Sequence, residues 1–416
     1  KRYQNTAARR KYEKTLIQKA KNAQYVIPGK DGYRFVEPGE QKLSAPPVIV
    51  GAGPAGLFCA LMLARHGYCP LVLERGQDVL HRQKTVEHFW QTGQLDPLSN
   101  VQFGEGGAGT FSDGKLNTLV KDPCGRNRLV LEIFREFGAE EGVLYQNKPH
   151  IGTDVLCHIV RRMRQEIIRL GGEIRFGCQV TDLLLDQGQV CGVVTGQGGS
   201  ISTHSIVLAI GHSARDTFSM LQKRGIPMSA KAFAVGLRIQ HPQAMINYAQ
   251  YGKETVDFPG AADYKLTWKA SNGRGVYSFC MCPGGYVVNA SSEQGMLAVN
   301  GMSYHDRAGL NANSALIVTV TPEDYPGEGS LAGVEFQRML EKQAFREGNG
   351  KIPVQLYQDF LDGKESVALG DVVPQMKGGW AFGRLHQVLP SALTKALGEG
   401  IRGFGQVIPG FDRADA

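Results

Sequence analysis

The chain has 416 residues, of which 42% are apolar and 20% are charged. This length favours two domains, and the composition is that of a soluble globular protein. No apolar run is long enough to cross a membrane, and none near the N-terminus has the form of a secretory signal.

The net charge of +7 is concentrated in residues 1–21, which hold eight Lys or Arg residues against one acid, Glu13. Such an arm can touch nucleic acid or an anionic membrane. It can also be the remnant of a targeting peptide, or a solvated helix laid on the body of the protein. We predict a basic N-terminal helix and lead-in over residues 1–45, with nucleic acid as an alternative partner of residues 1–21.

Eight cysteines are scattered along the chain, mostly in apolar runs. This is typical of buried thiols in a reducing compartment, so we expect a cytoplasmic protein. No two of them have zinc-ligand spacing or the C-x-x-C spacing of thioredoxin-type redox sites, and no metal site is predicted.

The first nucleotide-binding signal is an apolar strand at 48–50 that runs into the pattern Gly51-x-Gly53-x-x-Gly56 and a helix. Gly51 permits a tight turn, Gly53 lets the backbone approach a pyrophosphate, and Gly56 lets the helix pack closely against the strand. The helix N-terminus offers free N–H groups and its positive dipole end to the phosphates. Glu74, which comes directly after a second apolar strand, is placed to accept hydrogen bonds from an adenosine ribose. We therefore predict that this unit binds a dinucleotide.

A glycine-rich segment over residues 104–116 is predicted to wrap around the same ligand. Its glycines are too dense for the interior of a helix or strand. Thr110 and Ser112 add hydroxyl groups to the backbone N–H groups that can replace water around the ligand. A plain surface loop is the alternative, which the interleaved Phe103 and Phe111 disfavour.

Residues 153–211 complete the first domain in this prediction. A helix to Leu170 is succeeded by four short strands, at 173–176, 180–185, 190–195 and 205–210. Turn residues make the middle of this run an antiparallel hairpin array, and the last strand returns to the parallel sheet. Gly211 then lies at the carboxyl end of that strand, on the ligand side of the sheet.

From residue 231 the pattern changes to closely spaced strands with little helix between them. Helices at 331–346 and 354–361 are expected to cover one face of this region, and an apolar helix at 389–401 is expected to rejoin the first domain. The predicted fold class is α/β: a Rossmann-like dinucleotide-binding domain with a parallel sheet and an antiparallel meander, plus an inserted, mainly antiparallel α+β domain. The predicted boundaries are 46–230 for the first domain, 231–375 for the inserted domain and 376–416 for the return to the first.

Several of these motifs resemble a known group. Gly51–Gly56 with Glu74-Arg75-Gly76, the segment 104–116, the meander and Leu208-Ala209-Ile210-Gly211 are similar to the FAD-binding half of glutathione-reductase-like flavoproteins. Residues 233–242 (FAVGLRIQHP) and 279–285 (FCMCPGG) resemble a largely uncharacterised family of bacterial FAD-dependent dehydrogenase-like proteins. The resemblance covers residues 46–411 and implies FAD bound in an extended form, without indicating a substrate.

Carried over position by position, the resemblance places the pyrophosphate on Gly51–Gly56, the adenosine ribose on Glu74 and the adenine beside Val180. The flavin end then faces the loop 106–112 and the strand end at Gly211. The implied cofactor-binding residues are Gly51, Ala52, Gly53, Pro54, Ala55, Gly56, Glu74, Arg75, Gly106, Gly107, Ala108, Gly109, Thr110, Ser112, Val180, Ala209 and Gly211. The resemblance also implies a further Gly-rich segment past Ala416 that closes over the flavin, and we expect a chain that ends at Ala416 to bind FAD weakly or not at all.

The expected electron donor depends on the number of nucleotide-binding units. No second strand leading into Gly-x-Gly-x-x-Gly occurs after Gly56, so NADH or NADPH, if either is the reductant, is expected to dock directly against the second domain. The Asp-Gly-x-x-Ser-x-x-Arg segment of flavin hydroxylases is not reproduced at residues 211–215. Dehydrogenation or reduction therefore ranks above hydroxylation.

Four residues are predicted as catalytic candidates. Cys280 and Cys282 lie two apart, so on a strand both thiols face the same side and can meet the flavin as a redox pair; two small buried hydrophobes are the alternative. His305 can act as a general acid or base and Arg307 can hold an anionic substrate, while a polar hairpin loop explains the same residues. His212, directly after a strand end, is a further candidate, with helix capping as its alternative.

The sequence therefore predicts an FAD-dependent oxidoreductase that acts on an unidentified small molecule. The alternative from another class is a flavin-containing, nucleic-acid-associated or RNA-modifying protein tethered by residues 1–21. A flavoprotein that has lost its cofactor and survives as an interaction module is the third hypothesis.

Overall fold

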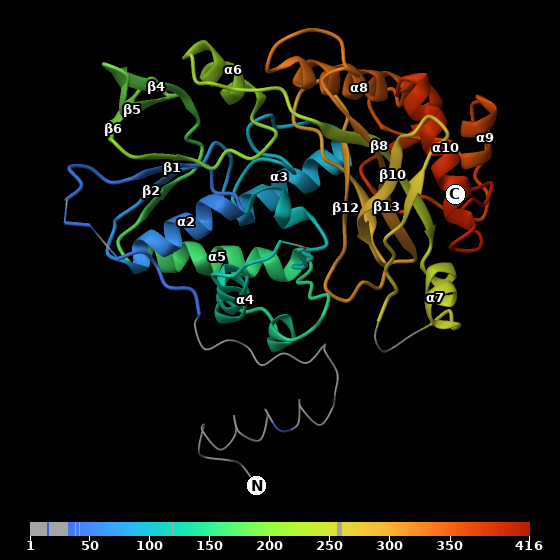
Figure 1. Ribbon diagram of the computed structural model, residues 1–416, viewed down its shortest axis with the longest axis horizontal. Coiled ribbons are helices and arrows are strands. Elements are labelled where there is room, and N and C mark those ends of the chain that lie inside the picture. Colours follow the sequence, from blue (N-terminus) through green and yellow to red (C-terminus); the bar gives the residue numbers. More distant parts are fainter. Residues whose placement is uncertain (1–14, 16–31, 38, 41, 119, 256–259) are drawn as a thin grey trace.

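The computed structural model of the protein describes Thr15 and residues 32–37, 39–40, 42–118, 120–255 and 260–416. Within these residues the chain forms two units, one built on a parallel sheet and one on antiparallel sheets (Figure 1). Apart from Thr15, the basic arm of residues 1–21 lies outside the described residues. In the described part of the chain, no helix has the length and apolar character needed to cross a membrane.

The first unit contains a four-stranded parallel sheet in the order β3-β2-β1-β7. Its strands are β1 (Val48–Val50), β2 (Leu71–Leu73), β3 (Glu173–Arg175) and β7 (Ile206–Leu208). Successive side chains of a strand point to opposite faces of a sheet. Ile49 therefore packs against helices on one face, while Val48 and Val50 belong to a separate apolar cluster on the other. A sheet buried on both faces explains why all three residues are apolar.

Two different layers cover this sheet. On one face lie α2 (Pro54–Arg65), α4 (Arg126–Glu136) and α5 (Thr153–Arg169), as Figure 1 shows. The other face packs against the antiparallel sheet β4-β5-β6 (Val180–Asp186, Gln189–Thr195 and Ser200–Ser202) and α6 (Arg215–Lys223). Helix α3 (Val79–Thr92) and the short helices η1 (Gly107–Phe111) and η2 (Glu141–Leu144) complete the unit. This is the parallel sheet with an antiparallel meander that the sequence predicts.

The second unit is mainly antiparallel. Its largest sheet has the order β8-β13-β10-β9, with strands Phe233–Pro242, Asn311–Val320, Gly275–Cys282 and Thr267–Lys269. A second sheet, β12-β11-β15 (Val299–Met302, Tyr286–Asn289 and Met376–Lys377), lies against it. The remaining elements are β14 (Ile352–Val354), β16 (Trp380–Phe382), α7 (Gln243–Tyr251), α8 (Ala332–Glu347), α9 (Tyr357–Asp362), η3 (Leu385–Gln387) and α10 (Ser391–Gly405). The predicted fold class, a Rossmann-like domain plus an antiparallel α+β domain, is confirmed.

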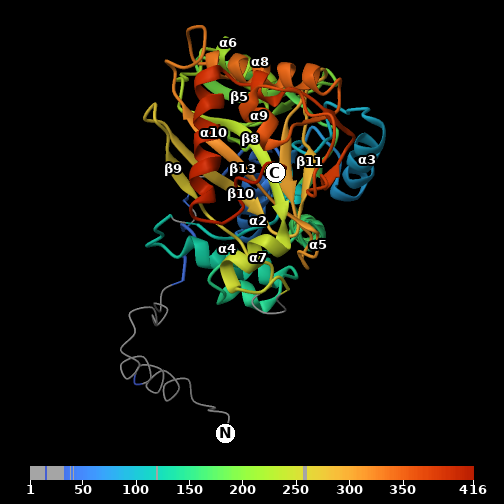
Figure 2. The same ribbon diagram turned by 90° about the vertical axis from the view of Figure 1, so that its right-hand side faces the viewer.

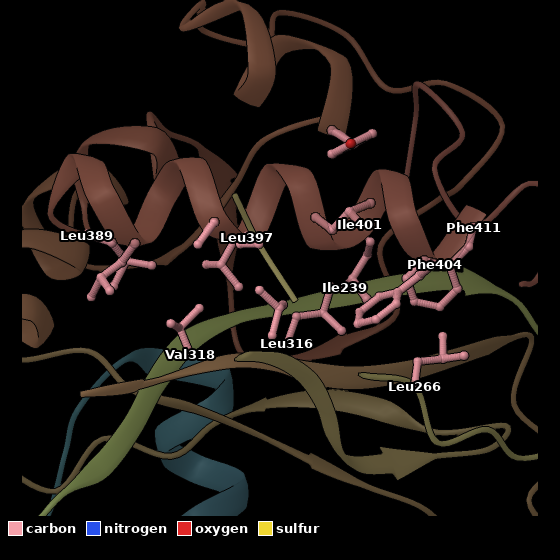
Figure 3. Close-up of a cluster of buried hydrophobic side chains, with 14 of the residues drawn as sticks. Ile239, Leu266, Leu316, Val318, Leu389, Leu397, Ile401, Phe404 and Phe411 are labelled. Carbon is pink, nitrogen blue, oxygen red and sulfur yellow. The ribbon is translucent and has the colours of Figure 1, made fainter. Parts of the chain in front are cut away.

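Helix α10 lies on the second unit, whereas the sequence predicted that residues 376–416 return to the first. Its apolar face packs on the β8-β13-β10-β9 sheet, in one cluster with Leu316 (Figures 2 and 3). Glycines let it approach closely: a Cβ on Gly403 would fall 2.2 Å from the ring of Trp268. The prediction of a helix was correct and the prediction of its partner was wrong, because an apolar helix face does not specify which sheet it covers.

Candidate functional site

The predicted dinucleotide loop joins β1 to α2. Gly51 has a φ of +103°, and a Cβ there would fall 2.5 Å from the carbonyl oxygen of Ala209. A Cβ on Gly56 would fall 1.9 Å from the carbonyl oxygen of Gly51. Both positions therefore require glycine. Gly53 differs, because a Cβ there would meet no atom closer than 3.9 Å, so its face is open for a ligand to approach the backbone.

Helix α2 begins with features that suit a bound anion. It has no side-chain cap and no acidic residue in its first turn. Its first backbone bond runs from the Leu57 N–H to the carbonyl of Gly53, so the N–H groups before Leu57 have no partner within the helix. These groups and the positive end of the helix dipole lie beside Pro54 and Ala55, which line a cavity. This helix end fits a phosphate group.

That cavity has a volume of about 430 Å³ and lies at the carboxyl ends of β1, β2 and β7. Of the predicted cofactor-binding residues, those lining it are Gly51, Gly53, Pro54, Ala55, Glu74, Arg75, Gly107, Ala108, Gly109, Val180, Ala209 and Gly211. Ala52, Gly56, Gly106, Thr110 and Ser112 are not part of its lining. Thr110 is buried, and the Ser112 hydroxyl donates to the carbonyl of Gly109 at 2.7 Å. The Thr110 and Ser112 side chains therefore stabilise the glycine-rich segment on the side that faces away from the cavity.

The carboxylate of Glu74 holds the loops around this cavity together. Its Oε2 accepts from the N–H of Ala52 at 2.7 Å, and its Oε1 accepts from the N–H groups of Gly76 at 2.9 Å and Gly104 at 3.0 Å. A carboxylate can accept about four hydrogen bonds, so one acceptor position is left for a ligand. Glu74 therefore organises both glycine loops in addition to the ribose contact predicted for it.

Arg82 on α3 shapes the glycine-rich segment, a role that sequence reasoning missed. Its side chain is fully buried and donates to the carbonyls of Asn100 at 2.9 Å, Val101 at 2.9 Å and Glu105 at 2.7 Å. The guanidinium also lies 4.9 Å from the ring centre of Phe111. Burial lowers the pKa of Arg82 to about 10, which leaves it charged at neutral pH. An arginine within a polar helix gives no sequence signal for this role, since solvated arginines occur in the same setting.

A second cavity, of about 540 Å³, meets the first one. Both cavities are lined by Gln102, Ala108, His212 and Ser213. One wall of the second cavity is formed by residues 233–238 of β8, the edge strand of its sheet. Most of the other walls are apolar side chains of the second unit. The two cavities therefore adjoin at these four residues, one on the side of the glycine-rich turn after β1 and the other inside the second unit.

Polar side chains mark the junction of the two cavities. The Ser213 hydroxyl donates to Oε1 of Gln102, and Nε2 of His212 lies 3.3 Å from the same hydroxyl oxygen. His212 keeps solvent-accessible surface, but desolvation by the surrounding cavity wall, aided by the charge of Arg215, lowers its pKa, so its imidazole is neutral at pH 7. Gln102 also donates to the carbonyl of Ala290 in the second unit at 2.5 Å. Sequence reasoning named His212 but missed Gln102 and Ser213, because isolated polar residues in loops have no periodic pattern.

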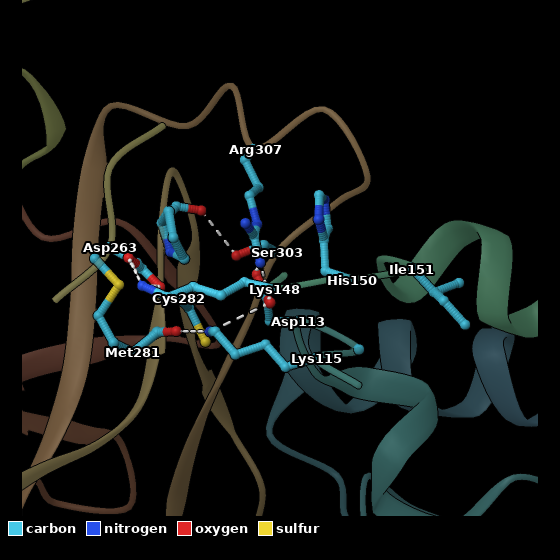
Figure 4. A network of polar contacts seen from close by, with 12 residues as sticks. Asp113, Lys115, Lys148, His150, Ile151, Asp263, Met281, Cys282, Ser303 and Arg307 are labelled. Carbon is cyan, nitrogen blue, oxygen red and sulfur yellow. Dashed lines mark hydrogen bonds and ion pairs between the residues drawn. The ribbon is translucent and has the colours of Figure 1, made fainter. Parts of the chain in front are cut away.

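The four predicted catalytic residues lie away from this junction. Neither cavity has Cys280, Cys282, His305 or Arg307 among the described residues that line it. His305 Nδ1 lies 2.9 Å from the carbonyl oxygen of Ile151, across the contact between the units. Arg307 and Cys282 belong to the same contact, as Figure 4 shows. The structure thus links Arg307, through Asp113 and Lys115, to the strand that carries the two thiols, and places none of the four residues in the lining of either cavity.

Asp113 is the centre of that contact. Its buried carboxylate accepts two hydrogen bonds from Arg307, one of them 2.9 Å long, and lies 3.2 Å from Nζ of Lys115 (Figure 4). Burial by itself raises the pKa of the Asp113 carboxyl, but Lys115 and Arg307 outweigh it and hold the pKa below its usual range. Lys115 also donates to the carbonyl of Met281 on β10. The glycine-rich segment is therefore tied to the strand that carries the two thiols.

Comparison with protein families gives two matches. A family described as pyridine nucleotide-disulphide oxidoreductase matches residues 46–217, and one described as FAD-dependent protein, C-terminal domain-like, matches residues 232–416. Together with the fold, these matches define the class as FAD-dependent oxidoreductase-like proteins. They support FAD as the cofactor. They give no support to the nucleic-acid alternative, whose basis, residues 1–21, lies almost entirely outside the described residues.

A relative and three solved structures are similar to the chain. An uncharacterized protein of Clostridium beijerinckii is 50% identical over 386 residues, which are 92% of this chain and 72% of that protein. The chain belongs to the same family of FAD-dependent oxidoreductase-like proteins. THI4 of Thermovibrio ammonificans is 18% identical with a TM-score of 0.30, over 55% of this chain and 74% of that one. A thioredoxin reductase of Gloeobacter violaceus is 20% identical with a TM-score of 0.21, over 40% and 34%. A mutant of the halogenase PltM in complex with FAD is 12% identical with a TM-score of 0.35, over 71% and 55%.

Proposed function

We propose that this protein binds FAD along the first cavity and oxidises or reduces a small molecule held in the second. The observation that carries the proposal is the junction, where Gln102, Ala108, His212 and Ser213 line both cavities. A dinucleotide that starts at Glu74 and passes Gly53 has its flavin end near this junction. The volume of the second cavity, about 540 Å³, lies within the usual range for small-molecule sites.

The residues of this chain bind and orient in the proposal, while FAD supplies the hydride or electron transfer when bound. The N-terminus of α2 holds the pyrophosphate, Glu74 offers its remaining acceptor position to the ribose, and Val180 lies beside the adenine. His212, neutral at pH 7, can donate or accept one hydrogen bond or proton at the junction. The apolar walls of the second cavity exclude water from a bound substrate.

The domain limits are part of the same proposal. Residues 46–230 form the FAD-binding domain, and residues 231–375 and 376–416 together form the second domain. The packing of α10 on β9, β10 and β13 supports this revision of the C-terminal boundary. NADH or NADPH, where either is the reductant, docks at the second cavity.

The variant Ala55→Asp tests the FAD site. Ala55 is exposed at the start of α2, where an added carboxylate is favourable for the helix but repels a phosphate group. We expect FAD affinity, measured by quenching of flavin fluorescence, to fall by about 10- to 100-fold, which corresponds to about 1.4 to 2.8 kcal/mol. Ala392→Asp is the matched control, because Ala392 is exposed in the first turn of α10 and lines neither cavity. Equal affinities of the two variants, or no uptake of FAD by the unchanged protein, would overturn the proposal.

The variant His212→Gln tests the position of the flavin ring. If the ring lies at the junction, replacing the imidazole changes its polar surroundings and shifts the visible absorption bands of bound FAD. His204→Gln is the control, because His204 is exposed and bonds to the carbonyl of Val190 in the meander. Spectra that are identical for His212→Gln and the unchanged protein contradict this placement.

An anaerobic titration with NADH and then NADPH identifies the reductant. Bleaching of the flavin absorption by one of them supports a nicotinamide-driven reductase. If neither bleaches the flavin while a chemical reductant does, the nicotinamide part of the proposal is wrong and the electrons come from the substrate.

A further inference from the structure

The strand that carries Cys280 and Cys282 is irregular at the thiols. β10 pairs with β13 through Phe279 and Ala315, and pairing resumes only at Cys282 and Asn313, so the register shifts at this point. Cys280 has a φ of +44°, in the left-handed region that non-glycine residues rarely adopt. Non-glycine residues held in this region tend to cluster at functional sites.

A second strained residue belongs to the same group of contacts. Among the described residues, four other than glycine have a positive φ, and two of these are Cys280 and Arg307. Arg307 pairs with Asp113, Asp113 lies 3.2 Å from Lys115, and Lys115 donates to the Met281 carbonyl between the thiols (Figure 4). The contact between the two units therefore holds the thiol-bearing bulge in its strained conformation.

The two thiols differ in their surroundings, and the Cys282 thiol donates to the carbonyl oxygen of Cys280 at 3.4 Å. Cys282 is fully buried, whereas Cys280 is only half-buried. Interaction with the Cys282 side chain lowers the pKa of the Cys280 thiol to about 6 against the opposing effect of burial, and the charges of Arg238 and Lys115 add to the lowering. The same interaction, together with burial, raises the pKa of the Cys282 thiol. Cys280 is therefore the thiolate of the pair at neutral pH.

Arg238 lies on β8, which is separated from the thiol-bearing β10 by β13, and its guanidinium contacts the thiol pair. Its Nη2 lies 2.6 Å from the carbonyl oxygen of Cys280 and 3.4 Å from the sulfur of Cys282. Its Nε donates to Oδ1 of Asn313 at 2.6 Å, which orients the guanidinium plane. The charge of Arg238 lowers the pKa of both thiols, because a nearby cation stabilises negative charge on sulfur.

We propose that Cys280 and Cys282 form a reversible dithiol–disulfide pair that is oxidised by hydrogen peroxide. The Cys280 thiolate attacks one peroxide oxygen, so that an S–O bond forms, the O–O bond breaks, and the leaving hydroxide takes a proton from solvent to become water. The Cys282 sulfur then attacks the sulfenic acid of Cys280, an S–S bond forms, the S–O bond breaks, and the departing hydroxide takes the Cys282 proton. Two thiols lose two electrons in total, and one peroxide becomes two waters.

The test uses the full chain and one tryptic peptide. Residues 275–307 contain both thiols, no other cysteine, and no Lys or Arg before Arg307. The reduced protein is exposed to hydrogen peroxide, blocked with a maleimide, digested and weighed by mass spectrometry. We expect the peptide to lose two hydrogens, to take up no maleimide, and to regain both thiols with dithiothreitol. The exposed Cys124 serves as the internal control, and we expect the peptide with both thiols to be oxidised about threefold faster at neutral pH, because Cys280 is ionised there.

Two variants separate the roles of the thiols. In the Cys282→Ser variant, oxidation is expected to stop at a sulfenic acid on Cys280, which dimedone traps. In the Cys280→Ser variant, the peptide is expected to stay unoxidised. The proposal is wrong if the unchanged protein keeps both thiols after Cys124 is oxidised, or if Cys280 proceeds to sulfinic acid without a disulfide. The measurement is made on the unchanged protein with and without added FAD, so that failure to bind FAD does not affect it.

Discussion

At the scale of single residues, Glu74 serves the fold and the proposed site at once. Its carboxylate accepts from three backbone N–H groups, which belong to the nucleotide loop, the end of β2 and the glycine-rich segment. The side chain is buried and lines the first cavity. A residue expected to bind a ribose is therefore also a structural link between two loops.

We expect Glu74→Ala to lower the free energy of unfolding by about 3 kcal/mol, because each buried donor left without a partner costs about 1–3 kcal/mol and the cavity admits some water. FAD affinity should fall as well. Urea denaturation and flavin fluorescence measure the two effects. Glu173→Ala is the control, since Glu173 is exposed and pairs with the exposed Arg175; an equal loss in both variants would contradict the role of Glu74.

At the scale of elements, α10 shows how close packing decides the position of a helix. Its apolar residues belong to the core cluster of the second unit (Figure 3), and its Gly400 and Gly403 face Val276 and Trp268 of the sheet. Besides Gly403, Gly400 lies so close to Val276 that a Cβ there would fall 2.5 Å away. These glycines lower helix propensity, and the loss is offset by the burial that the close approach permits.

Gly403→Ala tests this explanation. In an exposed helix the change would be stabilising by up to about 1 kcal/mol, but here the added methyl group overlaps the Trp268 ring. We expect the free energy of unfolding to fall by about 1–3 kcal/mol. Lys395→Ala, at a more exposed position of the same helix, should change it little. A stabilising effect of Gly403→Ala, read by urea denaturation, would show that α10 packs elsewhere.

At the scale of the whole molecule, the two units are joined by a buried polar contact. Asp113 and Lys115 belong to the glycine-rich segment of the first unit, and Arg307 and Met281 belong to the second (Figure 4). The Asp113 carboxylate is 1% exposed, so its pairing is little screened by solvent. This contact couples the position of the glycine-rich segment 104–116 to that of Cys280 and Cys282.

The stabilisation from Asp113 should depend on pH. Its pKa in the folded protein is lowered, so the contribution is fully present above the unfolded pKa of about 3.9 and is lost as pH falls through the folded value. The difference in unfolding free energy between the unchanged protein and Asp113→Asn is therefore expected to be largest from about pH 5 upward and to shrink below about pH 4. Urea denaturation across this range measures it.

The control for this prediction is Asp263→Asn. Asp263 also joins the two units, through a 2.8 Å contact with Lys148, but that pair is on the surface and should contribute little. A difference for Asp113→Asn that stays constant down to pH 3 would argue against an ionised Asp113 in the folded protein.

Local patterns in the sequence were sufficient for the first unit. A strand–turn–helix unit is built from contacts between residues that are close in the chain. Such contacts are specified by short apolar runs, by Gly51 and Gly56, and by the turn residues of the meander. The periodic helices α8 and α10 were predicted for the same reason. The basic arm, by contrast, has several alternative interpretations, and it lies almost entirely outside the described residues.

By itself, then, the sequence determined the fold class, the glycine-rich turn between β1 and α2 and the family resemblance, because these depend on residues that are close together in the chain. Only the tertiary structure decided that α10 covers the antiparallel sheet of the second unit and that His212 and Gln102 meet at a junction of two cavities. It also decided that Cys280 and Cys282 lie near Lys115 and Arg238 and do not line those cavities. Each of these contacts joins residues that are distant in the chain, and no local pattern encodes which distant partner an apolar face or a polar side chain meets.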